Sequence, residues 1–150
     1  MAATVEKLLL GSVTSLLTTG LNSLANNGRA AATAFDNTVG QTGDGYTLCD
    51  VELVVTYGVA PTANTGCSVW FCMSTDGTNY EDGSAADLTP ARLPDVVFPL
   101  RAVTSAQRIT RRVSLPWGKF IAMLINDATG QAMAASGNTL KIRPVTREMV

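Results

Sequence analysis

Apolar and polar residues alternate with a period of two along much of this chain. Between Cys67 and Ser74, both sets of alternating positions carry residues that favour strands. Asp76-Gly77 ends that stretch, because glycine reaches the positive φ of a tight turn and aspartate tolerates it. A longer stretch, from Tyr46 to Tyr57, has one apolar face and one half-polar face. Both segments are therefore predicted to be β-strands.

The same pattern predicts strands in the rest of the chain. Residues 119–126 are apolar on both faces, which is typical of a central strand covered on both sides. Residues 96–101 follow Pro94 and contain Pro99. Proline has no N–H to donate to a neighbouring strand, so we expect an edge strand there. Further strands are predicted at residues 29–35, 107–115 and 139–143. About eight short strands without a long helix indicate an all-β chain, an antiparallel β-sandwich of the jelly-roll type.

A chain of 150 residues fits one domain. We expect residues 21–150 to form a single β-sandwich and residues 1–20 to form an N-terminal arm, either a short helix or a strand. The long polar segment from Asp76 to Pro94 is a loop of the kind used for function or assembly. The inward-facing positions predict a core that contains Val51, Leu53, Val55, Val69, Phe71, Phe120, Leu124, Leu140 and Ile142.

The strand at residues 107–115 contains an anomaly. Arg111 has the parity of Ile109 and Val113, so a charged side chain points the same way as its apolar neighbours. Either a bulge lies at Arg111-Arg112 or Arg111 points toward a partner. From the parity we expect Arg111 to be buried against a carboxylate, with Arg108 and Arg112 on the exposed face.

Charge is distributed unevenly along the chain, although the net charge is only −1. Residues 1–95 hold three basic and ten acidic residues, and residues 96–150 hold eight basic and two acidic residues. The two parts therefore carry net charges of −7 and +6. The halves of a β-sandwich interleave, so the split need not survive in space. If it does survive, a basic and an acidic face would suit association between copies.

Several classes of chemistry are missing from the sequence. There is no histidine, nucleotide-binding glycine motif, P-loop or CxxC spacing, so the usual catalytic pairs and most transition-metal sites are excluded. We expect no enzyme, cofactor, small-molecule substrate, signal peptide or membrane span. Cys67 and Cys72 would point to opposite faces of one strand. With Cys49 they are expected to be three free thiols, made in a reducing compartment.

Two loop and aromatic signals have alternative interpretations. Clustered oxygen ligands in the segment 76–82 are of the kind that calcium takes, but their spacing matches no EF-hand, and a turn capped by Asx side chains is the preferred interpretation. Those ligands would be Asp76, Asn79, Glu81 and Asp82.

A sugar-stacking platform would form if three aromatic residues met on one surface: Trp70, Tyr80 and Trp117. We prefer that Trp70 packs into the core or a subunit interface and that Trp117 plugs a turn.

The three arginines of strand 107–115 would suit contacts with phosphate. Nucleic-acid sites normally add an aromatic stripe or a strongly basic domain, and this chain is slightly acidic. A solvated strand face is a further alternative. We therefore prefer a protein–protein contact and expect no nucleic-acid partner.

Four segments carry a resemblance to a known group of proteins. They are FPLRAVTSAQRITRRVSLPWGKFIAMLIND, the stretch LNSLANN at residues 21–27, STDGTNYEDG and AASGNTLKIRPV. Together they span most of residues 21–146, and the chain resembles small virion structural proteins of tailed bacteriophages. Such proteins are similar to jelly-roll cement or decoration proteins, which sit on the capsid and clamp neighbouring capsomers.

The resemblance implies a non-enzymatic role on the capsid exterior, for a protein made in the host cytoplasm. It implies two kinds of partner, the major capsid protein and copies of this chain, as a dimer or trimer. The alternatives are a carbohydrate- or receptor-binding module of a fibre, and a tail or neck component of the same virion. The residues that we expect at protein interfaces are Trp70, Arg101, Arg108, Arg111, Arg112 and Trp117.

Overall fold

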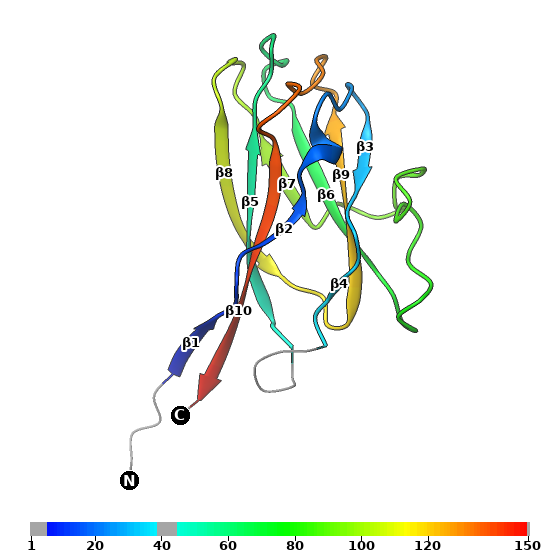
Figure 1. Ribbon diagram of the computed structural model, residues 1–150, viewed down its shortest axis with the longest axis vertical. Helices are drawn as coiled ribbons and strands as arrows, with labels where there is room; N and C mark the ends of the chain where they lie inside the picture. The colour runs from blue at the N-terminus through cyan, green and yellow to red at the C-terminus, as the bar shows by residue number, and fades with distance from the viewer. Residues whose placement is uncertain (1–5, 39–44, 150) are drawn as a thin grey trace.

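Two antiparallel β-sheets packed face to face make up the protein (Figure 1). The computed structural model describes residues 6–38 and 45–149. Sheet A contains β1 (Glu6–Leu10), β2 (Thr14–Leu17), β5 (Leu48–Val55), β8 (Gln107–Ser114) and β10 (Thr139–Met149). Sheet B contains β3 (Arg29–Ala31), β4 (Phe35–Asp36), β6 (Gly66–Met73), β7 (Val96–Pro99) and β9 (Lys119–Asp127). The described residues include a short 3-10 helix, η1 (Thr19–Leu21), and no helix that is long and apolar enough to cross a membrane.

The order of the strands identifies the type of sandwich. Sheet A runs β1–β10–β5–β8 with β2 also on β10, and sheet B runs β3–β9–β6–β7 with β4 also on β9. The paired strands are nested along the chain: β6 with β7, β5 with β8, β3 and β4 with β9, and β1 and β2 with β10. This is the strand order of a jelly roll. The predicted all-β jelly-roll sandwich is confirmed.

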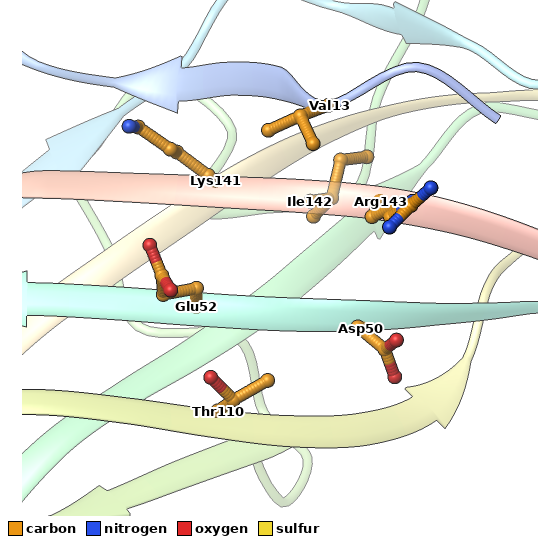
Figure 2. Close-up of a pocket in the computed structure, with 7 residues that line it drawn as sticks. All are labelled: Val13, Asp50, Glu52, Thr110, Lys141, Ile142 and Arg143. Carbon is orange, nitrogen blue, oxygen red and sulfur yellow. The ribbon is translucent and has the colours of Figure 1, made fainter. Parts of the chain in front are cut away.

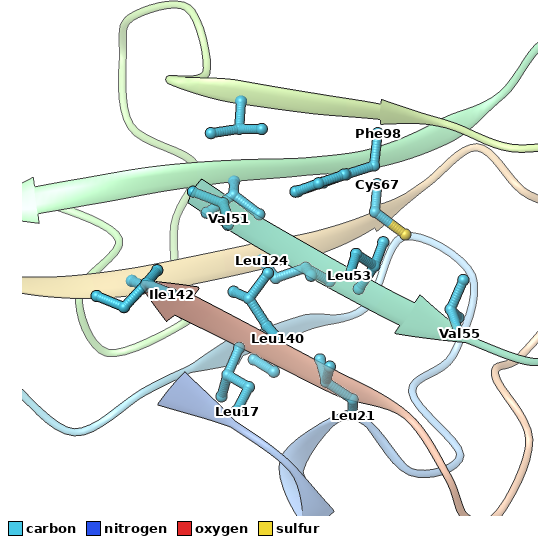
Figure 3. Close-up of a cluster of buried hydrophobic side chains, with 14 of the residues drawn as sticks. Leu17, Leu21, Val51, Leu53, Val55, Cys67, Phe98, Leu124, Leu140 and Ile142 are labelled. Atoms are coloured by element: carbon cyan, nitrogen blue, oxygen red, sulfur yellow. The ribbon is translucent and has the colours of Figure 1, made fainter. Parts of the chain in front are cut away.

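The core lies between the sheets and is built by alternate positions of their strands (Figure 3). Along β5, buried and half-buried residues alternate without interruption, and Leu53 at its centre has no exposed surface. The rings of Phe71 and Phe120, on neighbouring strands of sheet B, have centroids 4.9 Å apart. All nine residues predicted for the core are buried, which confirms the predicted strand faces.

Sheet B is apolar on its outer face as well. Strand β9 lies between β6 and the pair β3 and β4, as expected of a central strand. Its outward residues join those of β6 in a second buried cluster, which consists of Trp70, Cys72, Met123 and Ile125. The segment that links β6 to β7, residues 74–95, lies against this cluster and is called the excursion below. The excursion covers an apolar face that a two-layer sandwich alone would leave exposed.

Strand bounds differ from the predicted ones in two places. The predicted strand at residues 29–35 is interrupted and forms the separate strands β3 and β4. Strand β10 continues through Pro144 to Met149, although the prediction ended it at Arg143. This extension has β1 as its partner, a pairing between chain ends that local sequence does not reveal. The edge position predicted for residues 96–101 is confirmed by β7.

The segment assigned to an N-terminal arm divides into two parts in the structure. Strand β1 pairs only with the far end of β10. Strand β2 pairs with the start of β10, and its Leu17 is buried in the main core. Residues 6–10 and 14–17 are thus strands and not a helix, and residues 1–5 of the predicted arm lie outside the described residues.

Leu53→Asp is expected to abolish soluble folded protein. A buried charge without a partner costs several kcal/mol, against a total stability of about 5–15 kcal/mol. Val97→Asp, at a half-exposed position of β7, should melt close to the wild type. Circular dichroism and thermal unfolding of both variants provide the measurement. Native-like melting of Leu53→Asp would contradict the strand register.

The three cysteines are free and buried, as expected. Burial raises the thiol pKa of Cys49 and Cys67 to about 12 and that of Cys72 to about 11, from an ordinary value of 9.0. The thiols are therefore protonated and shielded at neutral pH. Only the unfolded chain ionises them between pH 9 and these raised values.

A thiol reagent at pH 8 is expected to react slowly with the native protein and with three thiols per chain after denaturation. Below pH 9, the ordinary thiol pKa, the thiols are protonated in both the folded and the unfolded protein and do not affect stability. Above it, only the unfolded chain loses these protons, so the free energy of unfolding falls as pH rises toward the raised pKa values of the folded protein. Thiol titration with and without urea, and urea melts at pH 8 and 10, measure both effects. One or no reactive thiol in urea would show that the cysteines are not free.

Candidate functional site

The outer face of sheet A carries charged side chains that pair across strands. Arg112 of β8 donates to both carboxylate oxygens of Asp50 on β5, at 2.7 and 2.8 Å. Arg108 donates to both oxygens of Glu52 at 2.8 Å. The bond from Arg112 is the main reason that the pKa of Asp50 lies below its ordinary value. Both arginines are exposed, as predicted, but their charges are already matched within the chain.

Strand β10 adds two more basic side chains on the other side of β5. In the sheet register Lys141 lies opposite Glu52 and Arg143 lies opposite Asp50. These four side chains border a shallow hollow of about 220 Å³, which Figure 2 shows. An acidic strand is thus flanked by basic strands on both sides. On this face, the −7 and +6 halves of the sequence do not produce separate acidic and basic surfaces.

Arg111 lies on the edge strand β8. The register of β8 is unbroken, so there is no bulge, and Arg111 lies opposite Val51 with the parity of Ile109 and Val113. Within this chain Arg111 is not buried against a carboxylate, and its burial against one at an interface with a partner stays a prediction. Its side chain is exposed and makes no ion pair within the described residues. Its neighbours of the same parity, Ile109 and Val113, pack against the core, whereas Arg111 between them stays exposed.

Trp70 is covered by the excursion and is not available as an interface residue in this structure. Its side chain is 5% exposed, and the indole N–H donates to the carbonyl of Arg92 at 3.0 Å. Trp70 therefore packs in the outer cluster of sheet B, in agreement with the preferred interpretation. A partner would reach it only after the excursion had opened.

Arg92 fastens the excursion to the sheet. Its guanidinium donates to both carboxylate oxygens of Glu81 at 2.7 and 3.0 Å, and to Asp95 at 2.9 Å. It also donates to the backbone carbonyl of Phe71 at 2.9 Å, and Asp95 accepts the Phe71 N–H at 2.7 Å. The bond to Glu81 is the main cause that raises the pKa of Arg92. Arg92 was not among the residues predicted for a site. Its only distinguishing feature in the sequence is that it is the single basic residue of an acidic loop.

Arg101 follows β7 and is exposed, as an interface residue should be. Its backbone is held by buried Gln107, which accepts the Arg101 N–H at 2.8 Å and donates to the Arg101 carbonyl at 2.9 Å. Its side chain makes no ion pair within the described part of the chain. Arg101 is therefore a rigidly placed, accessible cation.

Asp76 builds the turn after β6. Its carboxylate accepts the backbone N–H groups of Thr78 and Asn79 at 2.8 and 2.7 Å, the Asn79 amide at 2.7 Å and the Ser74 hydroxyl at 3.1 Å. These bonds, led by that from Asn79, lower the pKa of Asp76. The Asx-turn interpretation is confirmed, and Glu81 is bound to Arg92. The described residues contain no cluster of three metal-ligating side chains.

Trp117 lies on the turn between β8 and β9, and its side chain is 69% exposed. The interpretation that it plugs a turn is wrong. Its indole borders an open hollow of about 570 Å³, whose other lining residues include Met73, Asp76 and Lys119. Trp70 borders a different hollow, so Trp70 and Trp117 do not share one platform.

The sheet edges differ in how well they resist the addition of another strand. Charged side chains, proline, bulges and short length all protect an edge. Strand β8 has three arginines, β7 contains Pro99, and β3 and β4 have three and two residues. Strand β2 has four residues and a register shift against β10. Strand β1 carries charges only at Glu6 and Lys7, at its outer end. It pairs in unbroken register over five residues and continues with three leucines, so its Leu8–Leu10 part is less protected.

Strands β1 and β10 form a ribbon that extends beyond the body of the sandwich (Figure 1). Pairing between β10 and β5 ends at Val145, so the rest of the ribbon is two strands wide. Leu8 and Leu10 are 51% and 45% exposed, and Arg147 pairs with Glu6 at 3.1 Å. A two-stranded ribbon is marginal in water. The ribbon therefore offers both apolar surface and a free edge to a further strand.

Comparison with known proteins adds little to this description. No family model matches the chain, and no curated protein matches it. Among solved structures, the chain is similar to CBM35 from Paenibacillus barcinonensis, with 13% identity and a TM-score of 0.35. The likeness covers 97% of this chain and 98% of that chain. It is too distant to carry an argument about function.

Arg92→Ala is expected to release the excursion while the sandwich stays folded. The variant loses charge-assisted bonds to Glu81 and Asp95 together with the bond to the Phe71 carbonyl, a loss of about 2–3 kcal/mol. Trp70 emission should shift to longer wavelength, and proteases should cleave faster within residues 74–95. Arg101→Ala, at an exposed arginine outside this network, is the matched control. Unchanged emission and cleavage in Arg92→Ala would contradict the clamp.

Proposed function

We propose that this chain is a non-enzymatic structural protein of a tailed-phage virion, which lies on the capsid exterior and stabilises the shell by clamping neighbouring capsomers. The sequence resemblance supplies the class of protein, and the jelly-roll architecture is compatible with it. The observation that carries the assembly role is the β1–β10 ribbon, with its exposed leucines and free edge.

The ribbon suits a partner that supplies an extended strand. An added strand would pair with the outward backbone groups of β1, and its side chains would cover Leu8 and Leu10. Fully burying a leucine contributes about 1.5–3 kcal/mol, and these two are already half covered. On a shell, many such contacts act together, so modest affinity at each copy suffices. The major capsid protein is the proposed partner, and a second copy of this chain is the other.

The basic strands are a weaker docking surface than the sequence suggested. Arg108 and Arg112 are paired with carboxylates of β5, and a partner that used them would have to replace those bonds. Arg101 and Arg111 make no ion pair within the described residues, so they are the better rim contacts. Exposed rim charges contribute little affinity and act mainly on the rate of association.

Replacing Leu8 and Leu10 by serine is expected to weaken attachment to particles stripped of the native protein by about tenfold or more. The double variant should fold, because both leucines are about half exposed. The control replaces Leu88 and Leu93 of the excursion by serine, two leucines that are 54% and 85% exposed. Occupancy after rebinding, with thermal melting of each variant, provides the measurement.

Wild-type occupancy for the Leu8 and Leu10 variant, with loss for the control, would move the docking surface to the excursion. Quantifying the protein in purified virions tests the class itself. A decoration protein should be present in numbers comparable to the capsid protein and on the head. Far fewer copies, located on the tail, neck or fibre, would favour the alternatives, and absence from virions would overturn the proposal.

A further inference from the structure

We propose that the hollow beside Trp117 binds a neutral saccharide, with the apolar face of one pyranose ring stacked on the indole. The site involves none of the ribbon residues, so this inference does not depend on the proposed mode of attachment. It would give the protein a ligand-binding function in addition to a structural one.

The indole is presented by a turn that is fixed from behind. Buried Asn37 donates through its side-chain amide to the Pro116 carbonyl at 2.8 Å, and its backbone N–H donates to the Gly118 carbonyl at 3.0 Å. The residues before and after Trp117 are thus tied to one asparagine. The same side chain bonds Tyr46 on both its N–H and C=O, so all its polar atoms are used. A rigid aromatic platform loses little entropy when a ligand stacks on it.

Two glycines make this geometry possible. Gly118 has a φ of +93°, which allows the chain to reverse directly after the indole. Gly45 approaches the other side so closely that a Cβ there would lie 3.0 Å from Cδ1 of Trp117. One edge of the ring is therefore held against backbone, while most of the side chain remains in solvent.

Polar groups surround the indole in a way that suits hydroxyl recognition. The Lys119 side chain runs beside the Gly77 turn, and within the described residues its ammonium forms no ion pair. The Thr75 hydroxyl lines the same hollow and has no hydrogen-bond partner among those residues. Thr38 also lines the hollow, with a hydroxyl that donates to Asp36 and keeps its oxygen as an acceptor. Saccharides combine a C–H-rich ring face with hydroxyls at the ring edge, and this hollow offers a surface for each.

The charges of the hollow favour a neutral ligand. Asp76 accepts four hydrogen bonds from its own turn, three at Oδ1 and one at Oδ2, so it remains ionised and is committed mainly to the turn. Its charge offsets that of Lys119 across the hollow, and Asp36 adds a second nearby carboxylate. A carboxylate-bearing sugar would therefore meet no net positive field.

A saccharide also fits better than a protein anchor. The centre of a protein interface is a contiguous apolar patch, usually within at least about 1,000 Å² of buried surface. Beside Trp117, the hollow contains one other exposed large apolar side chain, Met73. The rest of its lining is polar or glycine. The volume of about 570 Å³ lies within the range of small-molecule sites.

Calorimetric titration and saturation-transfer NMR with cellotetraose, maltotetraose, mannotetraose and galactotetraose test the site, with sialyllactose and trigalacturonate as charged probes. We expect saturable binding of at least one neutral probe, reduced about tenfold or more in Trp117→Ala and less in Trp117→Phe. Leu88→Ala, at an exposed leucine outside the hollow, is the control and should bind as the wild type does. Because Trp117 is largely exposed, its variants should keep the wild-type melting temperature.

Three outcomes would overturn the inference: no binding of any neutral probe, binding that survives Trp117→Ala, or binding restricted to the two charged probes. In the first case, reduced rebinding of Trp117→Ala to stripped particles would identify the indole as a protein contact instead. Attachment that depends on Leu8 and Leu10 but not on Trp117 leaves the saccharide site standing, so the two proposals fail separately.

Discussion

The fold depends on one constraint, which is that sheet B is apolar on both faces. The inner face is buried by sheet A, but Trp70, Met123 and Ile125 point the other way and need their own cover. A helix layer would be the usual solution. Here the link between two adjacent strands is lengthened and folded back, and Arg92 fixes it through backbone and carboxylate contacts at once. The covering loop is thus part of the packed structure and not a free appendage.

Sheet A has the opposite character, because its outer face is wet and its charges are paired along the strands. An acidic β5 between basic β8 and β10 makes the sheet self-neutralising, so this face presents no strong field to a partner. The same arginines on β8, together with Pro99 on β7, discourage edge-to-edge growth. This is why the proposed association uses the ribbon, where sheet A is narrowest and its leucines are least covered.

Strand periodicity was sufficient to predict the faces of the sandwich but not the position of each strand within it. Leu53 and Phe120 were placed correctly because inward parity on a central strand implies burial. Arg111 has inward parity too, yet it is exposed on the edge strand β8. Edge position alone does not decide this, because Gln107 on β8 and Phe98 on the edge strand β7 are buried. Parity gives the direction of a side chain, whereas its burial depends on what the rest of the fold packs against it.

The two tryptophans show why the candidate sites were harder to predict than the fold. Local sequence places Trp70 in a strand and Trp117 between Pro116 and Gly118 in a turn, but it does not show which indole the rest of the chain covers. Hydrogen bonds between residues far apart in the sequence help to decide which of the two indoles is exposed. Arg92 closes the excursion over Trp70 from 22 positions away, and Asn37 holds the Trp117 turn from 79 positions away. An arginine in a loop and an asparagine between strands are common in any sequence, so neither carried a signal by itself.

The two proposed surfaces differ in how they are supported. The Trp117 hollow rests on a turn held by Asn37, whose side-chain polar atoms are all bonded, so the proposed small ligand would meet a preformed support. The ribbon differs: beyond Val145 it is two strands wide within the described residues, and under the proposed function an added strand would order it. A rigid site suits a small ligand that brings little binding energy. A marginal one suits a macromolecular partner whose added backbone hydrogen bonds can supply the order that the free ribbon lacks.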